Sequence, residues 1–305
     1  MTERRVFDTV LIVDWSARSS ASPKRGAADA IWWAVARGGA VEKPVYVRTR
    51  AEAVEQLGGF LAAEADAGRR VLAGFDFAFG YPAGLAALLT GRDHALALWE
   101  WLAREVRDGP DNANNRYAVA EAMNAAFDGL GPFWGRPQGW NHPGIPVRAS
   151  ARHGAHPPER RITEGRVPGA KSVWQLAYAG AVGSQVLLGL PALERLRNDP
   201  RLAGRIGVWP FDNGFDLPEA GIVLAEIYPS LLQREVRARM APGQVLDAAQ
   251  VATLSLALHR FDIAEGLSPL FSPPPGLSDA EFRAVTREEG WILGAGAADV
   301  LSSAL

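Results

Sequence analysis

Apolar and polar positions alternate in blocks along the chain, and the first apolar block lies within Thr-Val-Leu-Ile-Val-Asp-Trp-Ser at residues 9–16. Five apolar or β-branched residues follow one another there, which favours a strand buried on both faces. One acid, Asp14, stands at the carboxyl end of this block. Because a buried carboxylate is costly without a partner, the pattern predicts that Asp14 meets other functional groups.

The next blocks predict the order βββαβ for the first part of the chain. The Gly38-Gly39 pair lies between the second and third strands and indicates an antiparallel meander. The last strand of this part again ends in an acid, Asp76. The further strands are predicted over residues 31–36, 44–48 and 70–76, and the helix over residues 51–67.

The middle of the chain predicts helices and loops in place of strands. Residues 1–90 and 200–305 are therefore expected to form one α/β core, and residues 91–199 a large, mainly helical cap inserted after the fourth strand. No long linker separates the two, so we expect one compact unit. Helices are predicted over residues 94–106, 116–127, 174–188 and 191–197.

The last third returns to strand patterns and adds two more acids. Short apolar runs at residues 205–209 and 221–227 predict strands, and the second of these contains Glu226 near its end. Helices are predicted over residues 231–240 and 245–259. Asp247 falls in the first turn of the latter helix, where the helix dipole favours an acid.

Composition excludes several classes of function. The net charge of −2 lacks the basic excess of a dedicated nucleic-acid binder. The absence of cysteine excludes disulfides and thiolate catalysis. Neither a targeting segment nor a long apolar run is recognisable, so we expect a cytoplasmic protein without a membrane partner.

The four acids form the candidate site. Asp14, Asp76 and Glu226 lie at or near the carboxyl ends of predicted buried strands, where ligand sites assemble in α/β sheets. Asp247 would join them from its helix. Converging carboxylates repel one another, and oxygen ligands suit Mg²⁺ or Mn²⁺, so we expect one ion or two. The alternative is that these acids cap strands or form ion pairs.

The motifs carry a resemblance that spans nearly the whole chain. They are Val-Asp-Trp-Ser, Gly-Phe-Asp-Phe-Ala-Phe-Gly-Tyr-Pro, Ala-Glu-Ile-Tyr-Pro-Ser, Asp-Ala-Ala-Gln and Glu-Gly-Trp-Ile-Leu-Gly. In this order they resemble the DUF429 family of predicted nucleases, within the ribonuclease H-like superfamily. The resemblance implies a mixed sheet with a βββαβ core and metal-binding roles for the four acids. Relatives labelled as molybdopterin guanine dinucleotide biosynthesis proteins share the motif set.

A basic segment supplies candidate contacts to substrate. Residues 136–171 contain seven Lys or Arg and two acids, whereas the remainder of the chain has 25 basic and 32 acidic side chains. Arginine forks match phosphate oxygens, so this segment is expected to bind substrate phosphates, although a solvated loop is the plain alternative. The candidate substrate-binding residues are Arg148, Arg152, Arg160, Arg161 and Lys171, together with Lys24 near Asp14.

These observations favour a metal-dependent hydrolase of phosphate esters acting on a nucleotide or nucleic acid. The large cap favours a small or enclosed substrate over a long duplex. A second hypothesis is a non-catalytic nucleotide- or cofactor-binding protein of the same fold. An actin-like kinase is a weaker alternative, because the glycine-rich phosphate loops that it needs are not recognisable. Substrate, metal preference, oligomeric state and the role of each acid stay open at the level of sequence.

Overall fold

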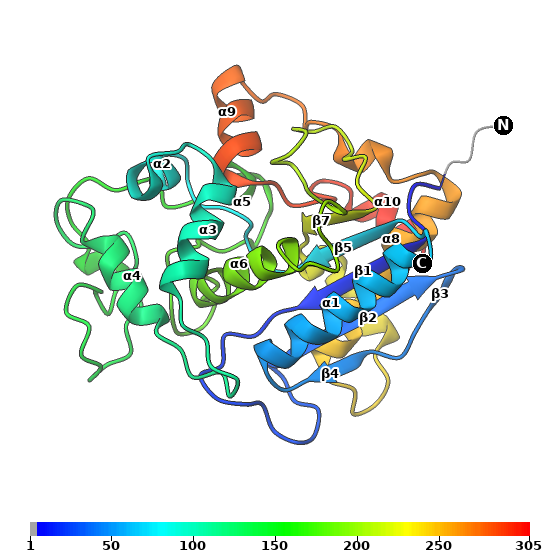
Figure 1. Ribbon diagram of the computed structural model, residues 1–305, viewed down its shortest axis with the longest axis horizontal. Coiled ribbons are helices and arrows are strands. Elements are labelled where there is room, and N and C mark those ends of the chain that lie inside the picture. Colours follow the sequence, from blue (N-terminus) through cyan, green and yellow to red (C-terminus); the bar gives the residue numbers. More distant parts are fainter. Residues whose placement is uncertain (1–4) are drawn as a thin grey trace.

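The fold is built around a mixed β-sheet with helices on both faces (Figure 1). The structure is a computed structural model and describes residues 5–305. The sheet order is β3-β2-β1-β5-β7-β6, with β4 also paired to β2. The strands are β1 (Thr9–Asp14), β2 (Ile31–Arg37), β3 (Ala40–Val41), β4 (Val45–Val47), β5 (Val71–Phe75), β6 (Ile206–Val208) and β7 (Ile222–Glu226).

Helices occupy much of the remaining chain. The α-helices are α1 (Arg50–Asp66), α2 (Leu85–Thr90), α3 (Ala95–Glu105), α4 (Arg116–Asn124), α5 (Ile162–Arg166), α6 (Gly183–Arg197), α7 (Gln233–Arg239), α8 (Leu246–Ala264), α9 (Asp279–Ala284) and α10 (Ala298–Ser303). Short 3₁₀ turns lie at Ala149–Ala151, Pro229–Leu232 and Ser268–Phe271, and a π-helical turn at Val285–Glu289. Of the helices in residues 5–305, none has both the length and the apolar character needed to cross a membrane.

The apolar run of β1 is continuous because both faces of the strand are covered. Leu11 and Val13 belong to the hydrophobic core on one side of the sheet, together with residues of α1, α3 and α6. Val10 and Ile12 belong to the core on the other side, which contains residues of α8. Side chains alternate between faces along a strand, so a single-faced strand would have alternated apolar with polar residues.

The predicted meander is confirmed, with one difference. β2 turns through Gly38-Gly39 into β3, and both β3 and β4 pair antiparallel with β2. The expected third strand, residues 44–48, is β4, and a further two-residue strand, β3, precedes it on the same edge of β2. Pro44 lies between β3 and β4, and proline cannot donate a ladder hydrogen bond.

The parallel part of the sheet places acids at one end of the strands. β5 pairs parallel with β1, β7 with β5, and β6 with β7. Their carboxyl ends therefore point the same way. Figure 1 shows α2, α3 and α4 beyond the carboxyl ends of these strands. Helix α6 packs against both α3 and α1.

The predicted helices at residues 174–188 and 191–197 are wrong in their bounds. Trp174 lies in a turn, and Gln175 forms an isolated β-bridge with Trp134. A single helix, α6, then begins at Gly183 and continues through Pro191. Val173, Trp174 and Leu176 are buried in this irregular segment, and their apolar spacing resembles one helical face over a few residues.

Candidate functional site

Three of the four predicted acids come together at the carboxyl edge of the sheet. Asp14 ends β1, and Asp76 directly follows β5. Because β1 and β5 pair Val13 with Phe75, the two aspartates are the next pair along the ladder. Asp247 reaches them from the first turn of α8, which packs against β1 and β2. The carboxyl groups of Asp14 and Asp76 interact with each other, and the charge of Asp247 acts on both.

Crowding and burial raise the pKa of each carboxyl group. Burial raises the pKa of Asp14 well above its usual range, and the charges of Asp76 and Asp247 add to the effect. Burial, with the charge of Asp247, raises the pKa of Asp76 to about 7. Burial also raises the pKa of Asp247. Near neutral pH the cluster therefore attracts positive charge, either as protons or as a cation.

Backbone donors hold two of these carboxylates in place. The Trp15 backbone N–H donates to Asp76 Oδ1 at 2.7 Å, and the Asp29 backbone N–H donates to Asp247 Oδ2 at 2.8 Å. The donor set is all oxygen, which suits Mg²⁺ or Mn²⁺. Within residues 5–305, no three histidine, cysteine or carboxylate side chains are already arranged to hold a metal ion together. An ion here would therefore take one or two of these carboxylates directly and complete its shell with water, as Mg²⁺ commonly does.

Glu226 does not join the three aspartates, in contrast to the expectation of four converging acids. β5 and β7 pair Phe75 with Glu226, so Glu226 points to the same side of the sheet as Phe75, whereas Asp76 points to the other. Arg161 binds both of its oxygens, with Nη1–Oε2 at 2.8 Å and Nη2–Oε1 at 2.6 Å. The Phe79 N–H donates to Oε2 at 3.0 Å. Glu226 is thus a neutralised member of a buried ion pair.

The expected role of Arg161 in binding substrate is also corrected. Its side chain is buried and donates to Glu164, Glu226 and the Glu289 carbonyl. Four hydrogen bonds from one guanidinium thereby satisfy two carboxylates and a carbonyl, so this arginine joins the insertion to the core.

Of the other predicted substrate-binding residues, Lys171 shares a cavity with one of the aspartates, and the rest do not converge on them. Arg152 forms an ion pair with Glu159 at 2.6 Å. Lys171 is exposed and lines a narrow cavity of about 50 Å³ that Asp76 and Glu226 also line. The remaining candidates, exposed at the surface and absent from the linings of both cavities at this edge, are Lys24, Arg148 and Arg160.

A larger cavity, of about 380 Å³, opens beside Asp14 and Asp247. Its opposite wall comes from the insertion and includes Arg116, Tyr117 and Gln185. Gln185 donates to the Trp15 carbonyl at 2.7 Å, which connects α6 to the segment after β1. The cavity thus lies between the core, which supplies the acids, and the insertion, which supplies a buried cation.

Arg116 is the site residue that sequence reasoning missed. Its Nε donates to Ser184 Oγ at 3.0 Å, and its Nη1 donates to Ser19 Oγ and Asn114 Oδ1, each at 2.8 Å. One sequence signal pointed to it: Arg116 is the first residue of a helix, where the helix dipole disfavours a cation. A cation in that position needs another reason to be there.

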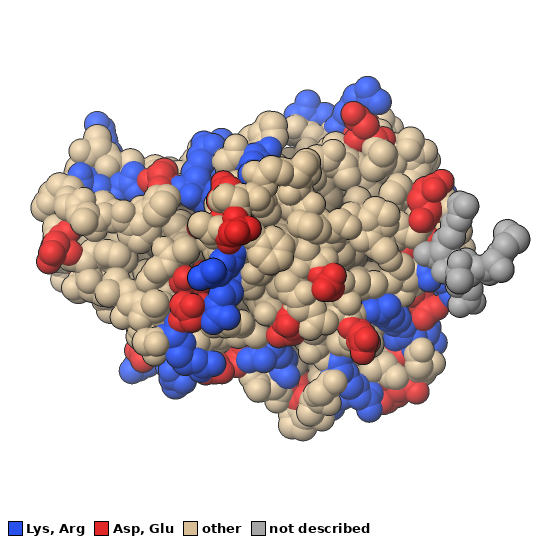
Figure 2. All heavy atoms as spheres, turned by 90° about the horizontal axis from the view of Figure 1, so that it is seen from above, with Lys and Arg blue, Asp and Glu red and all other residues tan. Residues whose placement is uncertain are grey.

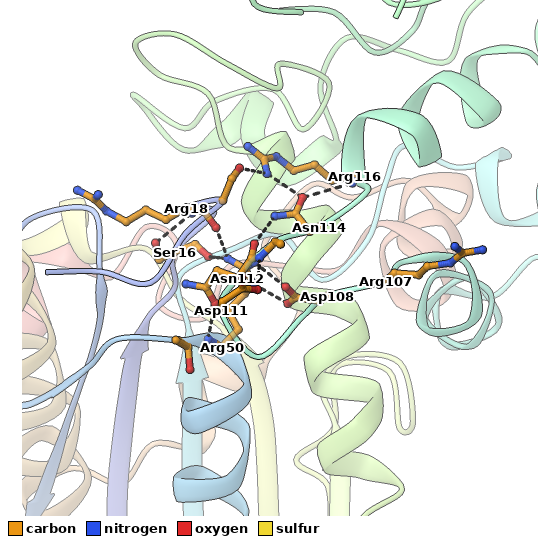
Figure 3. A network of polar contacts seen from close by, with 12 residues as sticks. Ser16, Arg18, Arg50, Arg107, Asp108, Asp111, Asn112, Asn114 and Arg116 are labelled. Atoms are coloured by element: carbon orange, nitrogen blue, oxygen red, sulfur yellow. Dashed lines mark hydrogen bonds and ion pairs between the residues drawn. The ribbon is translucent and has the colours of Figure 1, made fainter. Parts of the chain in front are cut away.

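A polar network holds the loop after β1 against the loop before α4 (Figure 3). Arg50 binds both oxygens of Asp108 at 2.6 Å and donates to the carbonyls of Ser16 and Arg18. Asn112 accepts from the Arg50 backbone N–H at 2.9 Å. The network therefore fixes the chain just before Arg116 relative to β1 and its Asp14.

The comparisons with known proteins assign no family. The chain matches no protein-family model, no curated protein and no solved structure significantly. The function must therefore be argued from the site itself.

Proposed function

We propose that the protein is a hydrolase of phosphate esters that depends on a divalent metal ion and has a ribonuclease H-like fold. The observation that carries the proposal is the convergence of Asp14, Asp76 and Asp247 at one end of the sheet. Asp14 is buried and Asp76 and Asp247 are half-buried, and three such carboxylates are unfavourable together unless protons or cations compensate them. The opening, in which β1 to β4 are followed by α1 and β5, has an aspartate at the carboxyl end of each of the adjacent parallel strands β1 and β5, and this supports the fold assignment.

The three aspartates have different roles in this proposal. Asp14 and Asp76 would hold the principal Mg²⁺ or Mn²⁺ ion, and Asp247 would bind its water or a second ion. Such an ion supplies an activated water and stabilises charge on the phosphate oxygens. The Trp15 and Asp29 backbone N–H groups orient Asp76 and Asp247. Glu226 has no direct part in this scheme, because Arg161 neutralises it.

A hydrolysis assay tests the proposal. Wild-type protein should cleave bis-p-nitrophenyl phosphate or p-nitrophenyl phosphate when Mn²⁺ is added and should lose this activity with EDTA. Asp14→Asn should abolish cleavage while the far-UV circular dichroism is unchanged. Cleavage that survives both EDTA and Asp14→Asn would contradict the proposal.

A second candidate is a non-catalytic nucleotide- or cofactor-binding protein of the same fold. The engagement of Glu226 by Arg161 favours it, because only three acids then remain for a metal centre. The resemblance to proteins labelled for molybdopterin guanine dinucleotide biosynthesis belongs to this candidate. Metal and nucleotide binding without cleavage of any ester would support it over the hydrolase.

A further inference from the structure

Arg116 differs from Arg50 and Arg161, which are also buried, because no carboxylate pairs with it. Arg50 binds both oxygens of Asp108, and Arg161 binds both oxygens of Glu226. Arg116 is 8% exposed and bonds to two hydroxyl groups and an amide oxygen, all of them neutral. In residues 5–305, no carboxylate lies within salt-bridge distance of it.

This unneutralised charge lies on the wall of the 380 Å³ cavity. Burying a cation without a counter-charge is costly, and neutral hydrogen bonds offset only part of that cost. Asp14 and Asp247 line the same cavity from the opposite wall, where they form the metal-binding side of the proposed site. A ligand anion between the aspartate-bound ion and Arg116 would be attracted to positive charge on both sides.

The hydrogen bonds to Arg116 orient its guanidinium. They use Nε and Nη1, so Ser184 on α6 and Ser19 in the loop after β1 hold the group from two directions. The side chain also lies against the ring of Tyr117, with the guanidinium carbon 4.9 Å from the ring centroid. An arginine held in this way loses little freedom when it binds an oxyanion.

The size of the cavity limits the ligand. A volume of about 380 Å³ lies near the lower end of small-molecule pockets, which span roughly 300–1,000 Å³. Polynucleotide binding instead relies on a basic surface that follows the phosphate backbone. On the face of the molecule in Figure 2, basic and acidic side chains are interspersed.

We propose that the site takes a small phosphate monoester, no larger than a mononucleotide, and that Arg116 binds its phosphate group opposite the aspartates. This inference rests on the proposed function and names its substrate class. In the reaction, water adds to phosphorus and the ester P–O bond breaks. The leaving oxygen takes up a proton, so the products are an alcohol and inorganic phosphate. Arg116 binds the substrate phosphate and then the product phosphate.

Calorimetric titration of inorganic phosphate into the Mg²⁺-loaded full-length protein tests the inference. Wild type should bind phosphate, Arg116→Gln should weaken binding by about tenfold or more, and Arg116→Lys should have an intermediate effect. Arg160→Gln is the matched control, because it removes an exposed arginine of the same insertion outside the cavity lining. It should bind phosphate as wild type does.

Two further variants keep the test decisive if Arg116→Gln does not fold. Arg116→Lys retains the charge, and Ser184→Ala removes the partner of Nε together with the Ser184 hydrogen bond to the Leu176 carbonyl. Both should weaken phosphate binding, and unchanged binding in both folded variants would overturn the inference. Tighter binding of a short single-stranded oligonucleotide than of AMP, competing with phosphate, would overturn the small-substrate assignment.

Failure of the inference is distinguishable from failure of the proposed function. Mg²⁺ binding measured alone should be the same in wild type and Arg116→Gln. If both bind Mg²⁺ and bind phosphate equally, the role of Arg116 is wrong and the metal centre stands. If wild type binds no Mg²⁺ at all, the proposed function itself is wrong.

Discussion

Asp76 accepts a hydrogen bond from the Trp15 N–H, yet its pKa is still raised to about 7, because burial outweighs the hydrogen bond and Asp247 lies nearby. An aspartate in the unfolded chain titrates near pH 3.9. Between these two values the folded protein binds more protons than the unfolded protein. The metal-free protein is therefore more stable on the acid side of this interval.

The first prediction is a loss of stability with rising pH in the metal-free protein. The contribution of Asp76 is fully present below its unfolded pKa and is lost as pH rises towards 7, with a slope of up to about 1.4 kcal/mol per pH unit. Asp76→Asn should flatten this slope. Urea unfolding between pH 4 and pH 8 measures it. A slope that is equally steep in Asp76→Asn would show that other groups cause it.

The second prediction separates Glu226 from the three aspartates. Glu226→Gln removes a charge from the buried pair with Arg161 and should destabilise the fold by about 3 kcal/mol. Its affinity for Mn²⁺ should stay that of wild type. Asp14→Asn should show the opposite pattern, with weaker Mn²⁺ binding and no loss of stability in the metal-free protein. A folded Glu226→Gln protein that no longer binds Mn²⁺ would contradict this prediction and show that Glu226 belongs to the metal site.

The acids could be found from sequence, but their grouping could not. Each of Asp14, Asp76 and Glu226 follows an apolar run, and that pattern is visible in the residues alone. The register between β5 and β7 decides which side of the sheet Glu226 faces, and a shift of one residue reverses it. Register depends on tertiary packing. The role of Arg116 could not be predicted for a related reason, since its position is set by Ser19 and Ser184, both far from it in the chain.

At the scale of elements, α6 lies closely against the segment that follows β5. A Cβ on Gly189 would come within 2.4 Å of the Phe77 ring, which is part of the buried core. The small residues around position 183 and position 189 therefore allow close packing and do not form a phosphate loop. Gly59 of α1 is different, because the nearest atom to a Cβ there is the guanidinium of Arg201 at 4.0 Å.

The third prediction uses this pair of helical glycines. Gly189→Ala should destabilise the protein by about 1–3 kcal/mol, because the added methyl group overpacks the core against Phe77. Gly59→Ala should stabilise it by roughly 0.5–1 kcal/mol, because alanine favours the helix and has room. Thermal unfolding of both variants measures the difference. Equal effects of the two substitutions would contradict the packing of α6.

The core elements were predictable because their apolar runs are long and bounded by glycine or acids. β1, β2, β5 and β7 all lie where the residue pattern places them. The insertion was less predictable, since segments such as Trp174–Leu176 are held by hydrogen bonds to Trp134 rather than by local propensity. Hydrophobic spacing alone cannot separate a short helix from an irregular segment whose apolar residues are buried.

At the scale of the molecule, the site lies where the insertion meets the sheet. The sheet brings aspartates from two neighbouring strands together, and α8 adds a third. The insertion adds Arg116 and one wall of the cavity. The Arg50–Asp108 ion pair fixes the insertion relative to the core (Figure 3). Neither part alone contains both the acids and the cation, so the proposed activity needs the whole chain.

The most direct test of the central claim is calorimetric titration of Mn²⁺ into wild type, Asp14→Asn and Asp247→Asn at neutral pH. Wild type should bind Mn²⁺, and at about 100 times the dissociation constant the ion should add about 2.7 kcal/mol to the free energy of unfolding. Asp14→Asn and Asp247→Asn should each weaken binding, Asp14→Asn more strongly. Wild type and both variants that fold alike and bind no Mn²⁺ would contradict a metal centre built from these three aspartates.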